Sequence, residues 1–437
     1  MIQRKKKDIV KVGYIGLGRR GMSMLNHCFS KMADVELSWI CDLREDRIAN
    51  ALTMFEEKGL PIPKTTTDYH EILRDPSVDA VLVMTGWDAH VKCSLDSMRA
   101  GKYTAVEVGV AYDLSECFEL IRVYEETGSP LMMLENCCYG RREMMALRMV
   151  KEGLFGEILH CAGGYMHFLN EWELMICKDG RFDTDHYRLY EYHKRNCEQY
   201  PTHEFGPIAK VLGINRGNRV LSLSSFASKS RAISQYMKDY VSETHPLHDA
   251  TFKQGDIVNT VLTCANGETV LLQLDTTAPR PFYSRGFTVR GTKGCCMEEG
   301  NVGTVFLEGM KEPVSGNEAE FFEKYDHPLH AEQTKYEALG PHEGGVDWIV
   351  GRAFIESVKA GTDTPIDAYD TATWMAIGPL SEASIAKGGM PVEFPDFTCG
   401  KWIRREPPIR GKYCLDEICE DPTTPIYPLR EKNTSAK

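Results

Sequence analysis

The chain has 437 residues, of which 42% are hydrophobic, and this is enough for two domains, or at most three, with substantial cores. Its net charge of −12 disfavours nucleic acid and anionic membranes as partners. No stretch approaches the roughly 20 apolar residues of a membrane span, and the basic N-terminus is not followed by an apolar signal core. The 15 cysteines are odd in number and irregularly spaced, which suits neither a disulfide framework nor a zinc site. The composition therefore predicts a large cytoplasmic enzyme with no metal centre.

The first predicted strand, at residues 10–15, leads into the glycine pattern Gly16-Leu-Gly18-Arg19-Arg20-Gly21 and then into a helix. Glycine at these positions lets the backbone turn tightly, lets its amides approach a diphosphate, and lets the helix pack closely on the strand. A second apolar run, Val35–Cys41, ends at Asp42, at roughly the 20-residue spacing of a carboxylate that binds ribose hydroxyls. The sequence predicts an NAD site, although Arg44 could neutralise the repulsion between Asp42 and the phosphate of NADP.

Helices and strands continue to alternate up to residue 136, as in a doubly wound parallel sheet. We expect helices at 45–58, 91–100 and 114–127, and strands at 80–85, 103–109 and 130–136. Ligands of such sheets lie just outside the carboxyl ends of the strands. Trp87 and His90 follow one of these ends, so they either line the nicotinamide pocket or cap the next helix.

Beyond residue 150 the pattern changes to longer β runs. Strands are expected at 156–167, 220–226 and 287–291, with an Asn-Gly hairpin turn inside 257–274. Alternation along the first of these runs places Tyr165 and His167 on one face, which suits a sugar site or, alternatively, a half-exposed sheet face.

The predicted fold is α/β with two domains. A Rossmann domain with a doubly wound parallel sheet spans residues 9–136. Residues 137–437 form an α/β domain with a large, mostly antiparallel sheet, one face of which is left open for substrate. The C-terminal segment of this second domain can pack back on the first.

The most informative polar stretch is Arg188–Pro207, which contains Tyr200-Pro-Thr-His203. Its proline indicates a fixed loop, and the helical pattern from Phe205 onward puts His203 near a helix start. Tyr200 and His203 could converge on one substrate. A structural role fits the composition equally well.

The glycine pattern, the passage from His90 through a helix to Ala-Gly-Lys at 100–102, and Glu107 resemble the Gfo/Idh/MocA group of NAD(P)-dependent sugar and polyol oxidoreductases. That group has Glu-Lys-Pro at the end of this strand, and its lysine assists hydroxyl oxidation. This chain has Glu107-Val108-Gly109 instead. The missing lysine disfavours an ordinary dehydrogenase mechanism.

Further motifs are Glu135-Asn136-Cys-Cys-Tyr139, Gly163-Gly-Tyr165-Met-His167, Tyr200-Pro-Thr-His203, Pro279-Arg-Pro281 and Gly344-Gly-Val-Asp347. Together they resemble glycoside hydrolase family 109, the NAD-dependent α-N-acetylgalactosaminidases of the same superfamily, over nearly the whole chain. This resemblance implies a glycosidase with a tightly bound NAD that is not consumed. Sugar C3 is oxidised, the C2 proton is removed, the C1 substituent leaves, water adds and the hydride returns. No pair of carboxylates flanking the bond is required.

The resemblance implies that His203 takes the C3 hydroxyl proton, because a histidine stands at this place in the superfamily and suits reversible transfer. Tyr200 and Tyr165 would remove the C2 proton and assist the leaving group, in an order that stays open. His167, Arg188 and Tyr283 would position the sugar. The expected cofactor-binding residues are Gly16, Gly18, Arg19, Arg20, Gly21, Asp42, Trp87, His90, Glu107, Glu135 and Asn136.

Two other functions stay open. A sugar or inositol dehydrogenase with net NADH production is supported by the glycine pattern and opposed by Val108. A non-catalytic sensor could bind dinucleotide and sugar without turnover. The expected substrate of the glycosidase is a terminal sugar, with α-linked N-acetylgalactosamine favoured, and the expected assembly is a homodimer or homotetramer.

Overall fold

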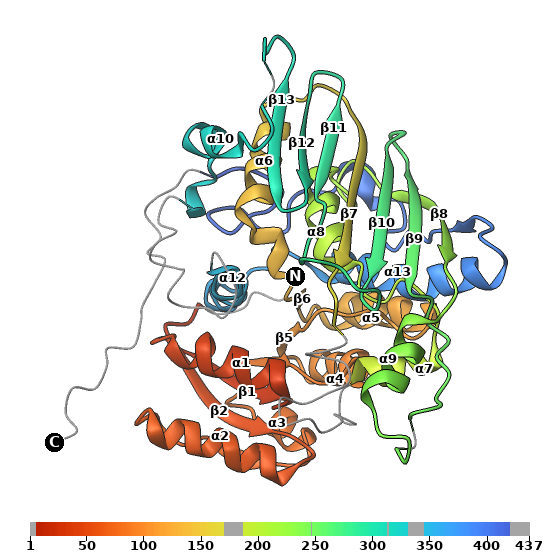
Figure 1. Cartoon of the computed structure of the whole chain (residues 1–437). Helices are drawn as coiled ribbons and strands as arrows, with labels where there is room; N and C mark the ends of the chain where they lie inside the picture. Colours follow the sequence, from red (N-terminus) through yellow and green to blue (C-terminus); the bar gives the residue numbers. More distant parts are fainter. Residues whose placement is uncertain (1–5, 170–186, 246, 313, 331–344, 420–437) are drawn as a thin grey trace.

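The computed structural model describes residues 6–169, 187–245, 247–312, 314–330 and 345–419 (Figure 1). Two β-sheets organise these residues, one of six strands and one of eight. Figure 1 shows the six-stranded sheet at the bottom and the eight-stranded sheet at the top, with helices between them.

The six-stranded sheet is the predicted Rossmann sheet. All its strand pairs are parallel, in the order β3-β2-β1-β4-β5-β6. Its strands are β1 (Val10–Ile15), β2 (Val35–Cys41), β3 (Lys64–Thr66), β4 (Ala80–Val83), β5 (Tyr103–Val106) and β6 (Leu131–Met133). The inner strands read as continuous apolar runs because helices cover both faces. The order reverses between β1 and β4, and such a switch point is where open α/β sheets bind ligands.

The helices of this sheet begin and end near the predicted residues, with one difference. They are α1 (Arg19–His27), α2 (Glu45–Glu57), α3 (His70–Arg74), α4 (Trp87–Arg99) and α5 (Leu114–Thr127), with a 3₁₀ turn η1 (Phe29–Lys31) after α1. We predicted that α4 begins at residue 91, but it begins at Trp87, because Gly86 takes the extended backbone of an N-cap. His90 therefore lies in the first turn of α4 rather than before it.

The eight-stranded sheet has the order β13-β12-β11-β7-β10-β9-β8-β14, and every pair except β7–β10 is antiparallel. Its strands are β7 (Ile158–Met166), β8 (Val220–Ala227), β9 (Ile257–Cys264), β10 (Thr269–Asp275), β11 (Thr288–Gly291), β12 (Gly294–Glu299), β13 (Val302–Leu307) and β14 (Val392–Glu393). The predicted Asn-Gly turn connects β9 to β10. The expected mostly antiparallel sheet is confirmed.

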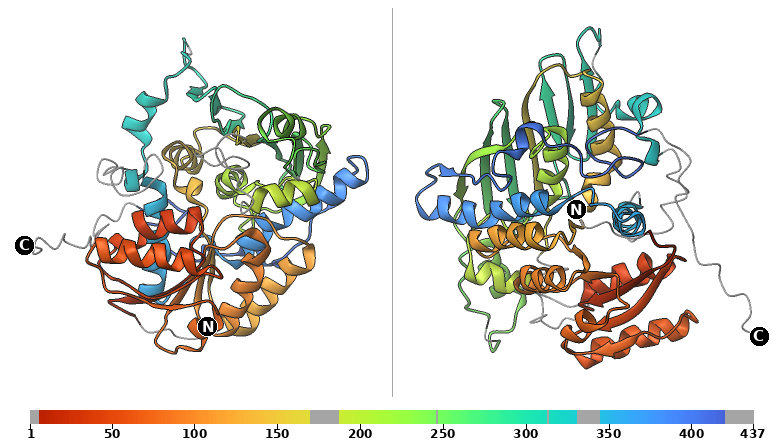
Figure 2. Two further views of the ribbon diagram at one scale, coloured as in Figure 1. Left: turned by 60° about the horizontal axis from the view of Figure 1, so that its bottom comes forward. Right: turned by 180° about the vertical axis from the view of Figure 1, so that it is seen from behind.

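Helices and 3₁₀ turns pack around this sheet and between the two sheets (Figure 2). They are η2 (Asn136–Tyr139), α6 (Arg141–Lys151), α7 (Tyr187–Lys194), α8 (Thr202–Val211), α9 (Ala232–Tyr240), α10 (Glu318–Tyr325), η4 (Pro328–His330), α12 (Val346–Ala360), α13 (Ala368–Ala386) and η6 (Lys401–Arg404). Helix α13 packs on both α5 and β8, so it joins the two sheets. Among the described residues, no helix combines the length and the apolar run that crossing a bilayer requires.

The two faces of the eight-stranded sheet differ. Helix α8 lies against β7, where a Cβ on Gly163 would come within 2.7 Å of Cβ of Glu204, so the glycine permits the close packing. On the opposite face Val261 is 40% exposed, while its neighbour Leu262 points inward and is fully buried. We predicted that the open face receives substrate, but Tyr165 alternates in step with Gly163 and lies on the helix-covered face. The cause is that α8 brings the polar loop before it to that side.

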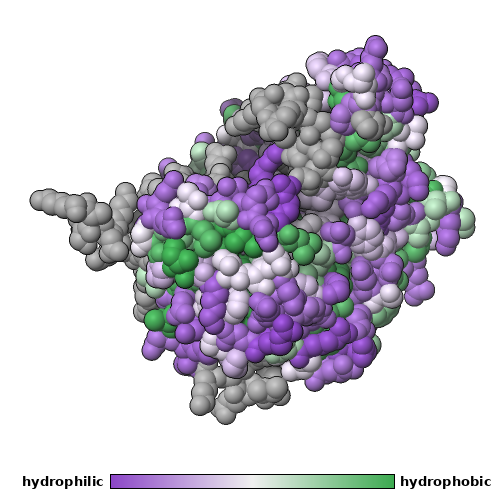
Figure 3. Space-filling view, turned by 90° about the horizontal axis from the view of Figure 1, so that it is seen from below, coloured by the Kyte–Doolittle hydropathy of each residue, from purple (hydrophilic) through white to green (hydrophobic). Residues whose placement is uncertain are grey.

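Seen from below, most of the surface is hydrophilic, and an apolar band interrupts it (Figure 3). This polar surface agrees with the acidic composition of the chain.

Candidate active site

The three glycines of the turn between β1 and α1 have different structural roles. Gly16 has φ +101°, and a Cβ there would lie 2.5 Å from the carbonyl oxygen of Met84. At Gly21 a Cβ would lie 2.2 Å from the carbonyl oxygen of Gly16. At Gly18, by contrast, it would meet only the Arg47 guanidinium, at 3.7 Å. Gly16 and Gly21 are therefore needed for packing, and Gly18 keeps a cradle open that a side chain would fill. A dinucleotide diphosphate fits this arrangement.

Asp42 lies beside this turn at the end of β2 and is 8% exposed. Its Oδ2 accepts a hydrogen bond of 2.7 Å from the amide of Leu17, and its Oδ1 accepts one of 2.9 Å from the amide of Arg44. The Arg44 guanidinium turns away to Asp46, with Nε donating over 3.0 Å. The carboxylate thus faces the turn where a ribose would lie, and its charge favours free hydroxyls over a 2′-phosphate.

Arg20, the second residue of α1 after Arg19, links the glycine turn to distant parts of the chain. Its guanidinium donates two hydrogen bonds, of 2.9 and 2.7 Å, to Asp347 at the start of α12, and its Nε donates one of 3.0 Å to Glu107. Asp347 is fully buried and also accepts a hydrogen bond of 2.8 Å from Nδ2 of Asn136. One network of hydrogen bonds thus joins three residues predicted at the cofactor site, Arg20, Glu107 and Asn136, to Asp347, which was not predicted there.

Trp87 and His90 occupy the first turn of α4 but point to different places. The indole of Trp87 donates a hydrogen bond of 3.0 Å to the carbonyl of Val108, and its ring centroid lies 5.8 Å from that of Tyr200. His90 bonds through Nε2 to the carbonyl of Thr85 over 3.0 Å. Burial lowers the pKa of His90 to about 4, so its imidazole is neutral at pH 7. Trp87 therefore reaches the aromatic side chains around Tyr200, whereas His90 braces the turn after β4.

His203, the second residue of α8, forms a dyad with Glu135 at the end of β6. Nδ1 of His203 lies 2.7 Å from Oε1 of Glu135, which also accepts a hydrogen bond of 2.9 Å from the amide of Cys137. Glu135 is completely buried. Burial raises the pKa of its carboxyl, but the charge of His203 and the hydrogen bond to it act in the opposite direction and leave the pKa below its ordinary value. The ionised carboxylate accepts the Nδ1 proton, so Nε2 is the nitrogen that can take a proton from substrate.

Aromatic side chains from three separate parts of the chain lie around this dyad. The ring centroid of Tyr200 lies 4.3 Å from that of Tyr165 and 4.8 Å from that of His203. Tyr283 lies 5.1 Å from His167 and 6.0 Å from Tyr165, centroid to centroid. The Tyr165 hydroxyl is 3.4 Å from Nδ1 of His167. The structure therefore brings together all five of these side chains that the sequence singled out, and we call them the aromatic cluster.

Arg188, on α7, adds a positive charge to the aromatic cluster. Its Cζ lies 4.7 Å from the ring centroid of Tyr200 and 5.5 Å from that of Tyr165. Burial raises the pKa of the Tyr200 hydroxyl well above its ordinary value, and the nearby Tyr165 raises it further, while the guanidinium of Arg188 lowers it. Arg188 is thus the cation that makes ionisation of Tyr200 less unfavourable.

Two residues that touch this site were not among the predicted site residues. Tyr187 packs edge-on against Trp87 with 4.8 Å between centroids, and its position next to Arg188 was the only signal for it. Asp347 belongs to the Gly344–Asp347 motif, whose first residue lies outside the described residues. The acidic residue that ends this glycine motif was the signal that could have identified it.

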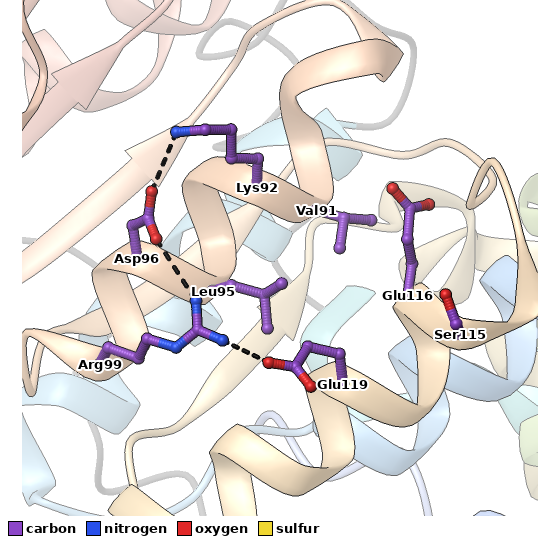
Figure 4. A pocket seen from close by; sticks show the side chains of 8 residues that line it. All are labelled: Val91, Lys92, Leu95, Asp96, Arg99, Ser115, Glu116 and Glu119. Carbon is purple, nitrogen blue, oxygen red and sulfur yellow. Dashed lines mark hydrogen bonds and ion pairs between the residues drawn. The ribbon is translucent and has the colours of Figure 1, made fainter.

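A groove between α4 and α5 lies on the surface of the Rossmann domain and does not include any residue predicted for the site. Its lining residues are Val91, Lys92, Leu95, Asp96, Arg99, Ser115, Glu116 and Glu119 (Figure 4). Most of its charges are paired with one another, because Asp96 binds Lys92 over 3.1 Å and Arg99 over 3.5 Å, and Arg99 also binds Glu119. The carboxylate of Glu116 accepts a hydrogen bond of 2.6 Å from the amide of Tyr112.

The parallel sheet has a glycine cradle and an acid after β2, and a histidine dyad lies between it and helix α8 of the second sheet. Together these features define an NAD-binding oxidoreductase fold. Residues 10–135 match the family model described as oxidoreductase family, NAD-binding Rossmann fold. A solved levoglucosan dehydrogenase in complex with NADH and levoglucosan has a TM-score of 0.63 at 18% identity, covering 89% of this chain and 100% of that chain. An NAD-binding oxidoreductase from Klebsiella pneumoniae has a TM-score of 0.67 at 15% identity, covering 89% of this chain and 100% of that chain.

The second half of the chain identifies the family more specifically than the first. Residues 139–404 match the model described as glycosyl hydrolase 109, C-terminal domain. An α-N-acetylgalactosaminidase of Tannerella forsythia is 38% identical over 430 residues, covering 93% of this chain and 91% of that protein. A glycosyl hydrolase family 109 protein of Stenotrophomonas maltophilia (strain K279a) is 38% identical over 431 residues, covering 92% of this chain and 93% of that protein. The chain belongs to glycosyl hydrolase family 109, as its motifs predicted, and is an NAD-dependent glycoside hydrolase.

Proposed function

We propose that the chain hydrolyses terminal N-acetylgalactosaminides, with the α-anomer favoured, by a redox-neutral route. In this route sugar C3 is transiently oxidised, the C2 proton is removed, the C1 substituent is eliminated, water adds and C3 is reduced again. The observation that carries the proposal is the Glu135–His203 dyad, which lies among polar aromatic side chains just beyond the carboxyl end of β6 in the Rossmann sheet. The name of the Tannerella forsythia relative supports the choice of sugar.

NAD⁺ fits the cradle at Gly18 and, when bound, supplies reversible hydride acceptance, and we propose that it is held tightly and not consumed. Asp42 and Asn136 would hold its ribose hydroxyls and nicotinamide end. The Nε2 of His203 would take the proton of the C3 hydroxyl and later return it. The ionised Glu135 fixes the imidazole through Nδ1 and stabilises the positive charge that forms on it.

Tyr165 and Tyr200 would remove the C2 proton and assist the leaving group, in either order. Both hydroxyls belong to the aromatic cluster, and Arg188 lies within 5.5 Å of both rings. His167 and Tyr283 would position the sugar at the edge of the cluster, where Tyr283 is 39% exposed. Substrate thus enters past Tyr283, and its reacting carbons lie deeper, near His203.

A dehydrogenase with net NADH production is the second candidate, because a solved levoglucosan dehydrogenase has a similar fold. Val108 opposes it. This side chain is 6% exposed and apolar, and it stands where the related dehydrogenases have a lysine that assists hydroxyl oxidation. Without that lysine, proton transfer depends on the His203 dyad.

The experiment that tests the proposal is hydrolysis of aryl α- and β-N-acetylgalactosaminides in heavy water, with and without added NAD⁺. We expect release of the aglycone, no net NADH, and one deuterium at C2 of the product sugar. Retained C2 hydrogen with accumulating NADH would identify the dehydrogenase. A His203→Ala variant separates both enzymes from a sensor, because a sensor keeps its ligand response after this change.

We also propose that the open sheet face joins two copies of the chain. Val261 pairs with Leu271, which in turn pairs with Ala162, so these three apolar side chains form a continuous strip across three strands. Val261 is 40% exposed, and the other two are half-buried in the single chain. A second copy would remove this strip from water.

A further inference from the structure

We propose that Glu135, Cys137 and His203 form an inhibitory binding site for a zinc-class cation. A carboxylate oxygen, a thiol sulfur and an imidazole nitrogen from these three residues lie within 4.8 Å of one another. The residues come from the end of β6, the turn η2 and the start of α8, so the packing of α8 on η2 holds them together.

The donor set selects the class of cation. Zinc binds nitrogen, sulfur and carboxylate oxygen at about 2.0–2.3 Å in a tetrahedron, so its ligands lie roughly 3.3–3.7 Å apart. Small rotations of the three side chains reach this spacing from the observed separations, which run from 2.7 Å between the His203 and Glu135 atoms to at most 4.8 Å. Magnesium and calcium prefer sets made only of oxygen and are disfavoured by the thiol.

Three protein ligands leave the fourth position of a tetrahedral cation open. His203 is the ligand that faces solvent, with 14% of its side chain exposed, so a cation can enter past it. Binding exchanges the thiol proton of Cys137 for a bond to the metal, and this proton leaves to water. The proton on Nδ1 of His203 shifts to Nε2, so the neutral imidazole coordinates through Nδ1. No oxidation or reduction is involved.

Occupation of this site would stop proton transfer by the dyad, because the cation takes a nitrogen of His203 and an oxygen of Glu135. The loss of hydrolysis rests on the function proposed above. The binding itself does not, because it depends only on the three donor atoms.

The chain contains its own matched control. Cys138 follows Cys137 directly and is equally a buried thiol, but it does not belong to the donor group. Its sulfur lies against α8 instead, where a Cβ on Gly206 would come within 3.0 Å of it. Cys137→Ser removes a ligand, and Cys138→Ser removes a thiol of the same environment without removing a ligand.

The test uses the full chain loaded with NAD⁺ and freed of metal by a chelator. Hydrolysis is measured against Zn²⁺, with Mg²⁺ as the control cation, and Co²⁺ is added separately to record thiolate charge-transfer and ligand-field absorption. We expect Zn²⁺ to inhibit reversibly and Mg²⁺ to have no effect. Cys137→Ser should raise the half-inhibitory Zn²⁺ concentration by at least about 10-fold, since even outer-shell changes cost 10- to 100-fold, and should lose the charge-transfer band, while Cys138→Ser keeps both.

Inhibition of Cys137→Ser at the same Zn²⁺ concentration as the unaltered protein would overturn the proposal, as would a Co²⁺ spectrum that Cys137→Ser leaves unchanged. If Cys137→Ser does not fold by circular dichroism, Cys137→Val, which restores apolar volume, replaces it. A protein that shows the Co²⁺ thiolate band but no glycosidase activity would refute the proposed function and leave the metal site standing.

Discussion

Replacing Glu135 by glutamine separates the charge of the dyad from its shape. The amide is isosteric and can still accept from Nδ1 of His203 over the observed 2.7 Å, but it carries no charge. A hydrogen bond to a charged group contributes about 1.5–3 kcal/mol and a neutral one about 1 kcal/mol. The imidazolium therefore loses about 1–2 kcal/mol of stabilisation. This corresponds to a fall in kcat/KM of roughly 5- to 30-fold, measured with an aryl N-acetylgalactosaminide under saturating NAD⁺.

Glu204→Gln is the matched control for this experiment. Glu204 directly follows His203 and is 1% exposed. Burial raises the pKa of its carboxyl well above the ordinary value and so favours the protonated form, which the amide matches in shape and in lack of charge. We expect kcat/KM within about 3-fold of the unaltered enzyme. The reasoning fails if Glu135→Gln keeps full kcat/KM, or if both variants lose activity to the same extent.

Three further predictions address the cofactor, the pH dependence of stability and the assembly. Gly18→Ala should weaken NAD⁺ binding by about 10-fold or more in calorimetry while leaving the melting temperature unchanged, whereas Gly16→Ala, at φ +101°, should lower the melting temperature. Burial raises the pKa of Glu198 to about 8, above the unfolded value of about 4.3. Between these two values the folded protein holds a proton that the unfolded chain has released, so the folded state loses stability as pH rises. Glu198→Gln should therefore gain melting temperature relative to the unaltered protein as pH rises from about 4 to 8, and a constant difference would contradict this. Val261→Lys should convert a dimer or tetramer into monomers in light scattering, and an unchanged mass would exclude the open sheet face as the interface.

Local patterns were sufficient to predict much of this molecule. The glycine turn and the spacing to Asp42 identified the Rossmann sheet, because both are consequences of one strand–turn–helix unit. The two-residue period of a strand places Tyr165 beside His167. Tyr200 lies beside His203 because only three positions, at the end of a loop and the start of a helix, separate them. Each of these pairs is close in sequence, so backbone geometry alone brings the side chains together.

Pairs that depend on tertiary packing could not be predicted in this way. Glu135 and His203 are 68 residues apart, and they meet because α8 packs against the turn that follows β6. Arg20 and Asp347 are 327 residues apart and meet only because α12 returns to the first sheet. The sequence assigned Glu135 to the nicotinamide, whereas its carboxylate bonds to His203. The periodicity of the sequence predicts neither of these two contacts.

In the proposed redox-neutral reaction, the dyad makes both a second carboxylate and a lysine at position 108 unnecessary. A redox-neutral reaction must release a proton from the C3 hydroxyl and later return it, so the proton carrier has to be equally usable in both directions. An imidazole held through Nδ1 by an ionised carboxylate meets this requirement, because the Glu135 charge stabilises the protonated ring without itself accepting the proton. A second carboxylate would be required only for direct displacement at C1, which the elimination route avoids. In that proposed reaction we expect the buried Val108 to cause no loss of proton transfer as long as the Glu135–His203 dyad is intact.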